Sequence, residues 1–313
     1  MGLFTKQNSG LTGLVLDNQQ ARFACIARDA SGKPAVQVLQ HAQLNATHNK
    51  PSDDASRALR RAAEGSGLDK ARYATLLGHN DYQLLLVEAP DVRPEELRAA
   101  VRWRIKDLIN FHIDDAVIDV FDIPGQANRA AGRMMYAVAA RAGVIRARAD
   151  LFEAAGLNLD IIDIPEMALR NVAALLPDDA HGIALLHLEP DHGFITLTRQ
   201  GTLYLTRRLE IGYEALRRDL GQADVLDNIV LEIQRSLDYY ESHYDTPPIN
   251  NLIVTPLPDD LADTVAHLNS NLNVQVAQLD INTVLDDQSG TQSISADALT
   301  AVGCALRREE VAL

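Results

Sequence analysis

The sequence contains little cysteine, and this excludes two kinds of small structure. Only two of its 313 residues are cysteines, Cys25 and Cys304, and each stands in an apolar run. A disulfide framework or a thiolate metal site needs several cysteines at close spacing, and no Cys-x-x-Cys pair occurs. Both cysteines are therefore predicted to be small core residues.

Long hydrophobic runs are also missing. No run approaches the roughly 18 apolar residues that indicate a membrane-spanning helix. The opening stretch Met1-Gly-Leu-Phe-Thr-Lys lacks the apolar core of a signal peptide. These two absences predict a chain that stays in the cytoplasm and is held at a membrane only by other proteins.

Positive charge is in deficit. The 29 Lys and Arg residues against 43 Asp and Glu residues give a formal net charge of −14. Because neutralising a phosphate backbone requires a surface of Lys and Arg, nucleic acid is not predicted as a partner. The hydrophobic content of 47% is that of a well-cored globular protein, and the length suffices for two domains.

Motifs for catalysis and phosphate binding are absent as well. The sequence has no Gly-x-x-x-x-Gly-Lys-Ser/Thr, no Gly-x-Gly-x-x-Gly and no His-x-x-x-His. Its nine histidines are scattered, and His187 and His192 flank one turn without the further ligands that a metal needs. The sequence thus predicts no catalytic residue and no metal site.

What the sequence does contain is one unit that occurs twice. Residues 182–244 are predicted to form three strands joined by tight turns, followed by a long helix from about residue 224 with an apolar stripe. Residues 13–64 show the same order of three strands and a helix. The units start about 170 residues apart, at 13 and 182, and they predict a duplicated α/β architecture.

The block between the two units has the pattern of an insertion. Residues 82–163 follow the order strand, helix, strand, strand, helix, strand, which is a compact split-βαβ arrangement. The first helix of this block carries the only tryptophan, Trp103, off its apolar stripe. Trp103 is interpreted either as a half-buried helix residue or as one wall of a groove for a partner.

Three stretches resemble the PilM-like proteins of type IV pilus systems, which share the actin-like ATPase fold with the cell-division protein FtsA. The stretches are VRWRIKDLINFHIDDAVIDV at 101–120, LDIIDIPEMALRN at 159–171 and EIQRSLDYYE at 232–241, helped by AVGCALR at 301–307. Within the second, Ile-Pro-Glu-x-Ala-Leu-Arg-Asn is most similar to the MshI proteins of the mannose-sensitive haemagglutinin pilus. Together with the order of elements, the resemblance spans nearly the whole chain.

The resemblance implies a fold and a division of the chain. The implied fold is α/β, a duplicated actin-like (RNase H-like) fold with an inserted SHS2-like βαββαβ subdomain. The first actin-like half would comprise residues 1–81 plus 164–180, the inserted subdomain 82–163, and the second half 181–313.

The first phosphate turn departs from the pattern of the ATP-binding members of that family. Those members carry Asp-x-Gly followed by small hydroxyl residues, where this sequence has Val15 and Asp17, then Asn18-Gln19-Gln20. Phosphate binding favours glycine turns, because the backbone N–H groups must approach the anion closely. The loss of glycine here predicts a degenerate nucleotide cleft.

The second turn departs in the same direction. The second Asp-x-Gly of the family falls on His187 and Glu189, with Asp191 beside them, and the Gly-Gly near the adenosine falls around 255–258. Extra carboxylates would repel a triphosphate by a few kcal/mol at an effective dielectric constant of about 20. We therefore expect no cofactor, although Asp17, Glu189 and Asp191 are carboxylates of the kind that hold Mg²⁺ with ATP.

By resemblance, the function is that of a scaffold without catalytic activity in type IV pilus assembly. It would lie at the inner membrane through its partners, binding the N-terminal tail of a PilN-like (MshJ-like) membrane protein and contacting other assembly-platform proteins. In PilM-like proteins that tail lies as an extended peptide beside the inserted subdomain, which places the groove near four residues: Tyr82, Leu84, Trp103 and Phe111.

Two other functions stay open from the sequence. One is an active actin-like ATPase or polymerising protein with atypical phosphate loops, which glycines in the two turns would have favoured. The other is an actin-like sugar kinase, which requires a catalytic Asp beside a substrate pocket, and no such Asp is identified.

Overall fold

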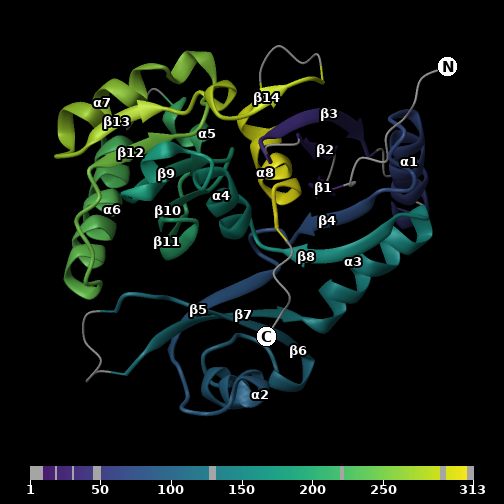
Figure 1. Ribbon diagram of the computed structural model, residues 1–313, viewed down its shortest axis with the longest axis horizontal. Helices are drawn as coiled ribbons and strands as arrows, with labels where there is room; N and C mark the ends of the chain where they lie inside the picture. Colours follow the sequence, from purple (N-terminus) through teal and green to yellow (C-terminus); the bar gives the residue numbers. More distant parts are fainter. Residues whose placement is uncertain are drawn as a thin grey trace.

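The computed structural model describes residues 10–17, 20–29, 32–44, 51–126, 132–218, 222–289 and 294–308. The strands of these residues form three sheets, of six, five and three strands. The two larger sheets stand next to each other, and the smallest lies below them in the view of Figure 1. No helix in the described part of the chain is long and apolar enough to cross a bilayer.

The first sheet begins with an antiparallel meander of three strands. The meander comprises β1 (Leu11–Leu16), β2 (Gln20–Arg28) and β3 (Pro34–Gln43), and α1 (Pro51–Gly65) follows it. On its other side β1 pairs in parallel with β4 (Arg72–Leu76), and β4 pairs in parallel with β8 (Asn158–Asp163). The short strand β14 (Asp286–Asp287) pairs with β3, so the order is β14-β3-β2-β1-β4-β8.

The second sheet repeats this order, which confirms the predicted duplication. Its meander comprises β9 (Ile183–Leu188), β10 (Gly193–Arg199) and β11 (Thr202–Leu209), followed by α5 (Tyr213–Leu216) and α6 (Gln222–His243). Next come β12 (Asn251–Val254), α7 (Asp263–Asn271) and β13 (Gln275–Gln278). The order β11-β10-β9-β12-β13 corresponds strand by strand to β3-β2-β1-β4-β8.

The third sheet is antiparallel and interrupts the first half. It has the order β5-β7-β6, from β5 (Tyr82–Glu88), β7 (Met134–Arg141) and β6 (Ala116–Asp122). The helix α2 (Pro94–Ile105) packs on one face through Val101 and Ile105. Short 3₁₀ helices occur at Ile113–Asp115, Pro177–Ala180, Asp259–Leu261 and Ile281–Thr283.

The predicted block 82–163 is wrong in its last strand. Residues 158–163 form β8, which pairs with β4 in the first sheet and not with β5, β6 or β7. The helix before it, α3 (Ala142–Ala155), packs on α1 and precedes β8 as α7 precedes β13. A strand's own residues do not identify its neighbour, so the sequence pattern could not distinguish the two pairings.

The last helix of each half lies on the sheet of the other half. After β8, α4 (Pro165–Ala173) packs against β9 and β10 through Leu169 and Ala173. After β13, α8 (Ala296–Ala305) packs against the first sheet, beside β1 and β2 in Figure 1. The assignment of all of 181–313 to the second half is therefore wrong for β14 and α8, whose partners lie in the first sheet.

Two glycines allow α8 to approach its neighbours closely. A Cβ on Gly13 of β1 would collide with the backbone oxygen of Ala301, and a Cβ on Gly303 would collide with the backbone oxygen of Ala168. The backbones of β1, α8 and α4 thus lie in direct contact. The amide of Asn171 donates to the oxygen of Gly303 at 2.9 Å, which fixes α4 on α8.

Candidate functional site

Two hollows lie where the units meet. One, called the cleft below, is a cavity of about 740 Å³ between the first half and the turn after β9. The other, called the groove, is a cavity of about 440 Å³ between β5 and β11. The charged and imidazole side chains of the cleft are Asp17, Arg22, His79, Asp81, Arg148, Glu189 and His192.

In the turn after β1, the two described residues, Asp17 and Gln20, bind each other. The carboxylate of Asp17 accepts from the N–H of Gln20 at 2.6 Å and pairs with Arg22 at 2.8 Å. The N–H of Asp17 in turn donates to the oxygen of Gln20 at 3.0 Å. These two amides are therefore engaged within the hairpin, while Asn18 lies outside the described residues.

The turn after β9 brings Glu189 to the same cleft as Asp17. The Glu189 carboxylate lies 3.1 Å from Nε2 of His187, whose Nδ1 lies 3.0 Å from the hydroxyl of Thr255. Burial acts to raise the pKa of Glu189, but the hydrogen bond and the charge of His187 outweigh it, so the pKa is lowered. Glu189 is thus an ionised carboxylate fixed on a fully buried histidine.

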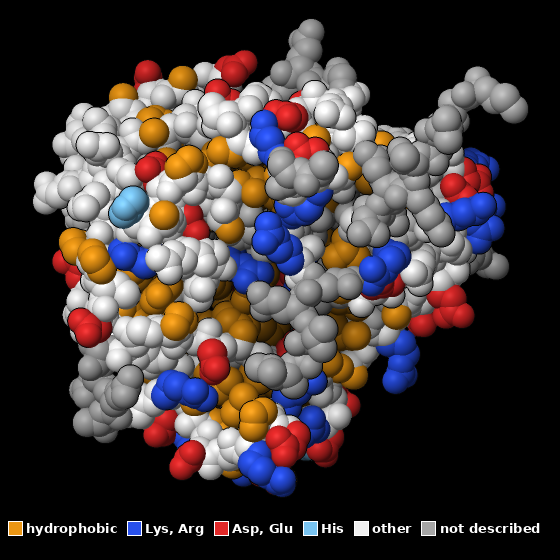
Figure 2. Space-filling view, viewed as in Figure 1, with side chains coloured by type: hydrophobic (Ala, Val, Ile, Leu, Met, Phe, Trp, Pro, Cys, Tyr) orange, Lys and Arg blue, Asp and Glu red, His pale blue; other side chains and the backbone are white. Residues whose placement is uncertain are grey.

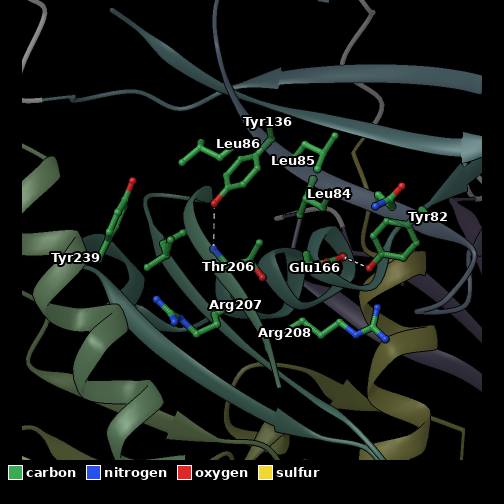
Figure 3. A pocket seen from close by; sticks show the side chains of 12 residues that line it. Tyr82, Leu84, Leu85, Leu86, Tyr136, Glu166, Thr206, Arg207, Arg208 and Tyr239 are labelled. Carbon is green, nitrogen blue, oxygen red and sulfur yellow. Dashed lines mark hydrogen bonds between the residues drawn. The ribbon is translucent and has the colours of Figure 1, made fainter. Parts of the chain in front are cut away.

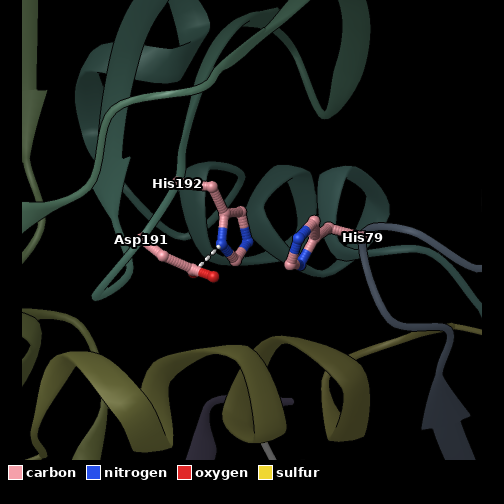
Figure 4. A group of neighbouring side chains, drawn as sticks. All are labelled: His79, Asp191 and His192. Carbon is pink, nitrogen blue, oxygen red and sulfur yellow. Dashed lines mark hydrogen bonds and ion pairs between the residues drawn. The ribbon is translucent and has the colours of Figure 1, made fainter.

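His192, in the same turn, faces a residue that the sequence analysis missed. Its ring lies 3.8 Å from the ring of His79, centroid to centroid, and its Nδ1 lies 2.7 Å from Asp191 (Figure 4). The hydrogen bond from His192 lowers the pKa of Asp191, and burial together with His192 lowers that of His79. His79 comes from the turn between β4 and β5, 113 positions before His192 (192 − 79), and no local pattern links the two.

The groove lies between two outermost strands of the described sheets, β5 and β11. Figure 3 shows Tyr82, Leu84 and Leu86 of β5 on one side, and Arg207 and Arg208 of β11 on the other. The aromatic rings of Tyr136 and Tyr239 complete the lining. Figure 2 shows hydrophobic side chains in a hollow between the upper lobes and the lower one, with Lys and Arg around it.

One end of the groove contains a buried acid. The hydroxyl of Tyr82 donates to Glu166 at 2.6 Å (Figure 3). Burial raises the pKa of Glu166 to about 7, despite the opposing effect of this hydrogen bond. Glu166 belongs to the Ile-Pro-Glu stretch at the start of α4, the helix that packs against β9 and β10. Its hydrogen bond with Tyr82 of β5 therefore connects the inserted sheet to this helix.

The four residues predicted for the partner groove do not lie together. Tyr82 and Leu84 line the groove. Phe111 packs with the cluster under α2, on the opposite face of the small sheet, and the guanidinium of Arg141 lies 4.7 Å from its ring centre. Trp103 points to solvent from α2 with 71% of its surface exposed, more than the half-buried interpretation expected.

Comparisons with known proteins agree on the fold. Residues 33–223 match the family described as type IV pilus assembly protein PilM. The structure resembles that of a PilM–PilN type IV pilus biogenesis complex with a TM-score of 0.74 and 16% identity, over 95% of this chain and 98% of that one. No match was found among curated proteins.

Two more distant structures have the same architecture. The cytoplasmic domain of EpsL, an inner-membrane component of the type II secretion system of Vibrio cholerae, gives a TM-score of 0.51 at 13% identity, over 96% of this chain and 97% of that one. A Bacteroides thetaiotaomicron protein with an actin-like ATPase fold and unknown function gives 0.50 at 9% identity, over 96% and 98%. These likenesses confirm the predicted actin-like fold.

Proposed function

Because the chain belongs to the PilM family of type IV pilus assembly proteins, we propose that it is a cytoplasmic scaffold of the MshI kind. It is held at the inner membrane by binding the N-terminal tail of a PilN-like (MshJ-like) protein, and it contacts other proteins of the assembly platform. The similar structure described as a PilM–PilN complex supports a partner of that class. The scaffold works without catalysis and without ATP.

The groove is the site that best supports binding of an extended tail. In the described sheets β5 is an outermost strand, so its outer edge can pair with an added strand. Tyr82, Leu84 and Leu86 occupy alternate positions of β5, and all three side chains line the groove. Leu84 and Leu86 also pack against the core of the second half. The observation that carries the proposal is this combination of an open strand edge and an apolar lining.

The partner's tail is expected to be apolar with an acidic group near one end. Arg207 and Arg208 line the groove opposite β5, each already paired with one carboxylate, Glu232 at 2.8 Å and Glu210 at 3.3 Å. Their remaining N–H groups can donate to a carboxylate of the tail. Tyr239 offers a ring for an apolar side chain of the tail.

Binding of a synthetic tail peptide tests the site. A labelled peptide of the N-terminal cytoplasmic segment of the PilN-like protein is titrated with the full chain, and anisotropy is recorded. Leu84→Ala and Tyr239→Ala are expected to weaken binding about 30-fold each, the effect of losing a hot-spot contact of about 2 kcal/mol.

Trp103→Ala is the matched control, because this exposed side chain lies outside the groove. Its binding curve is expected to match that of the unmodified protein. If Trp103→Ala abolishes binding and Leu84→Ala does not, the partner site lies on α2 and not in the groove. If the peptide does not bind at all, the tail is not the partner.

The proposal that the scaffold works without ATP is supported by the two turns. The amides of Asp17 and Gln20 are engaged in the first turn, and the N–H of Glu189 donates to the oxygen of His192 at 2.8 Å in the second. These N–H groups are therefore not available to phosphate oxygens. The carboxylates of Asp17 and Glu189 would also repel a triphosphate. Calorimetry with ATP and Mg²⁺ is expected to show no heat at millimolar ATP. Micromolar binding would establish the alternative, an actin-like ATPase with atypical phosphate loops.

A further inference from the structure

We propose that His79, Asp191 and His192 form a binding site for a divalent transition ion of the zinc class. Their donor atoms lie within 4.8 Å of one another, and they come from two turns that face each other across the mouth of the cleft (Figure 4). Among the described residues, no other group of His, Cys, Asp and Glu side chains meets this condition.

The donor atoms need only a small adjustment to bind an ion. Four ligands at 2.0–2.1 Å around a tetrahedral zinc lie about 3.4 Å apart, so the three side chains would close in by little more than an ångström. Each side chain stands in a turn, at 77–81 or 189–192, where side-chain rotation suffices. Three protein ligands leave the fourth position to water.

An ion at this site takes the place of two hydrogen bonds. Nδ1 of His192 lies 2.7 Å from an oxygen of Asp191, and the ion lies between these two groups in place of the proton that they share. Nε2 of His79 carries a lone pair, because it accepts from the amide of Asn80 at 2.9 Å, and the ion displaces that amide.

The turn that carries His79 is held in place by β11. Arg208 donates from Nη1 to the oxygen of His79 at 2.5 Å and from Nη2 to Asn80 at 3.0 Å. Such support keeps a ligand oriented before the ion arrives. The positive charge of Arg208 opposes a cation, and Glu210, 3.3 Å from its Nε, offsets that charge.

The donor set decides the class of ion. Two imidazole nitrogens and one carboxylate suit zinc, cobalt, nickel or copper, whereas magnesium and calcium prefer oxygen ligands alone. Bound there, the ion joins the turn before β5 to the turn before β10 and restrains the two walls of the cleft. None of the three ligands lines the peptide groove, but Arg208 belongs both to the groove and to the support of the His79 turn.

Titration of the tag-free, chelator-treated full chain with zinc tests the site. We expect one ion per chain by calorimetry, and a cobalt complex with visible absorption that zinc displaces. His79→Gln and His192→Gln are each expected to weaken zinc binding at least tenfold, in line with the effect of altered ligand shells. Zinc should raise the melting temperature of the unmodified protein and leave that of both variants unchanged.

His181→Gln is the control, because it removes an exposed histidine outside the cluster. It should bind zinc as the unmodified protein does. All variants are compared first in chelator, where equal melting temperatures show that they fold. Zinc binding that survives both cluster substitutions, or no binding at about 100 μM zinc, would overturn the proposal.

Discussion

In the first half, the turn after the opening strand holds an exposed carboxylate, whereas the equivalent turn of the second half holds a mostly buried one. The side chain of Asp17 is 43% exposed and pairs with Arg22 of its own hairpin. The side chain of Glu189 is 17% exposed and pairs with His187, which is fully buried on β9. Equivalent positions of a duplicated fold have thus taken opposite roles.

The difference shows that the second turn is part of the core of its half. The His187 ring connects Glu189 to Thr255 after β12, so one hydrogen-bonded chain runs from the turn into the interior. The contacts of Asp17 with Gln20 and Arg22 lie within its own hairpin. A turn integrated into the core cannot move freely around a nucleotide, which fits a fixed scaffold.

The largest expected loss of stability comes from forcing apart α8 and α4, the two helices that are exchanged between the halves. Gly303→Val is expected to cost at least about 3 kcal/mol of unfolding free energy, because overpacking a backbone contact reaches the top of the usual range. A Cβ there meets the backbone of Ala168, which cannot rotate away. Urea unfolding followed by circular dichroism measures the loss.

Gly143→Ala is the control for this substitution. Gly143 lies in α3, where an added Cβ meets nothing within 4 Å. We expect an unchanged or slightly higher stability, since Ala favours a helix over Gly by about 1 kcal/mol. Similar losses for both variants would contradict the close contact of α8 with α4.

Protonation of Glu166 probes the junction of the inserted sheet with α4. Its pKa of about 7 exceeds the ordinary 4.5, so the folded state holds the proton more tightly than the unfolded chain. Unfolding free energy should therefore fall as pH rises from about 4.5 to about 7, by up to about 3 kcal/mol (2.5 pKa units at 1.36 kcal/mol each).

Glu166→Gln isolates this contribution. Its amide oxygen still accepts from Tyr82, but it does not ionise. The difference in stability between the unmodified protein and the variant should change across that pH window and stay flat above it. Parallel pH profiles for the two proteins would show that Glu166 has an ordinary pKa.

The smallest effects come from the two turns themselves. Glu189→Ala removes the partner of buried His187 and is expected to cost about 2 kcal/mol, as for a buried polar group left unpaired. Asp17→Ala removes an exposed pair and should cost about 1 kcal/mol or less. Urea unfolding of both variants gives the ranking, and a reversed order would mean that the first turn is the more firmly held.

The duplicated fold was predictable because its signals are local. Alternation of apolar residues and tight turns identified both meanders, and they occur where predicted. The partner of β8 was not predictable, because pairing depends on residues elsewhere in the chain. Residues 286–287 form β14 beside β3, a pairing that no local pattern of the sequence indicates.

The candidate sites were predictable only in part for the same reason. Resemblance pointed to Asp17 and Glu189, and both line the cleft. His79 stands in an ordinary Gly-His-Asn-Asp turn, and it becomes a candidate ligand only because the fold places its ring next to that of His192. Trp103 drew attention as the only tryptophan, yet composition says nothing about which face of a helix meets a groove.

The exchange of closing helices has a consequence for how the protein is made on the ribosome. The face of the first sheet that α8 covers, with Ala24, Ile26 and Val36, stays bare until residues near 300 have been translated. N-terminal segments fold first during synthesis, so this apolar face is exposed while more than half of the chain is still to come. A nascent first half therefore needs protection from aggregation until the final helix closes it.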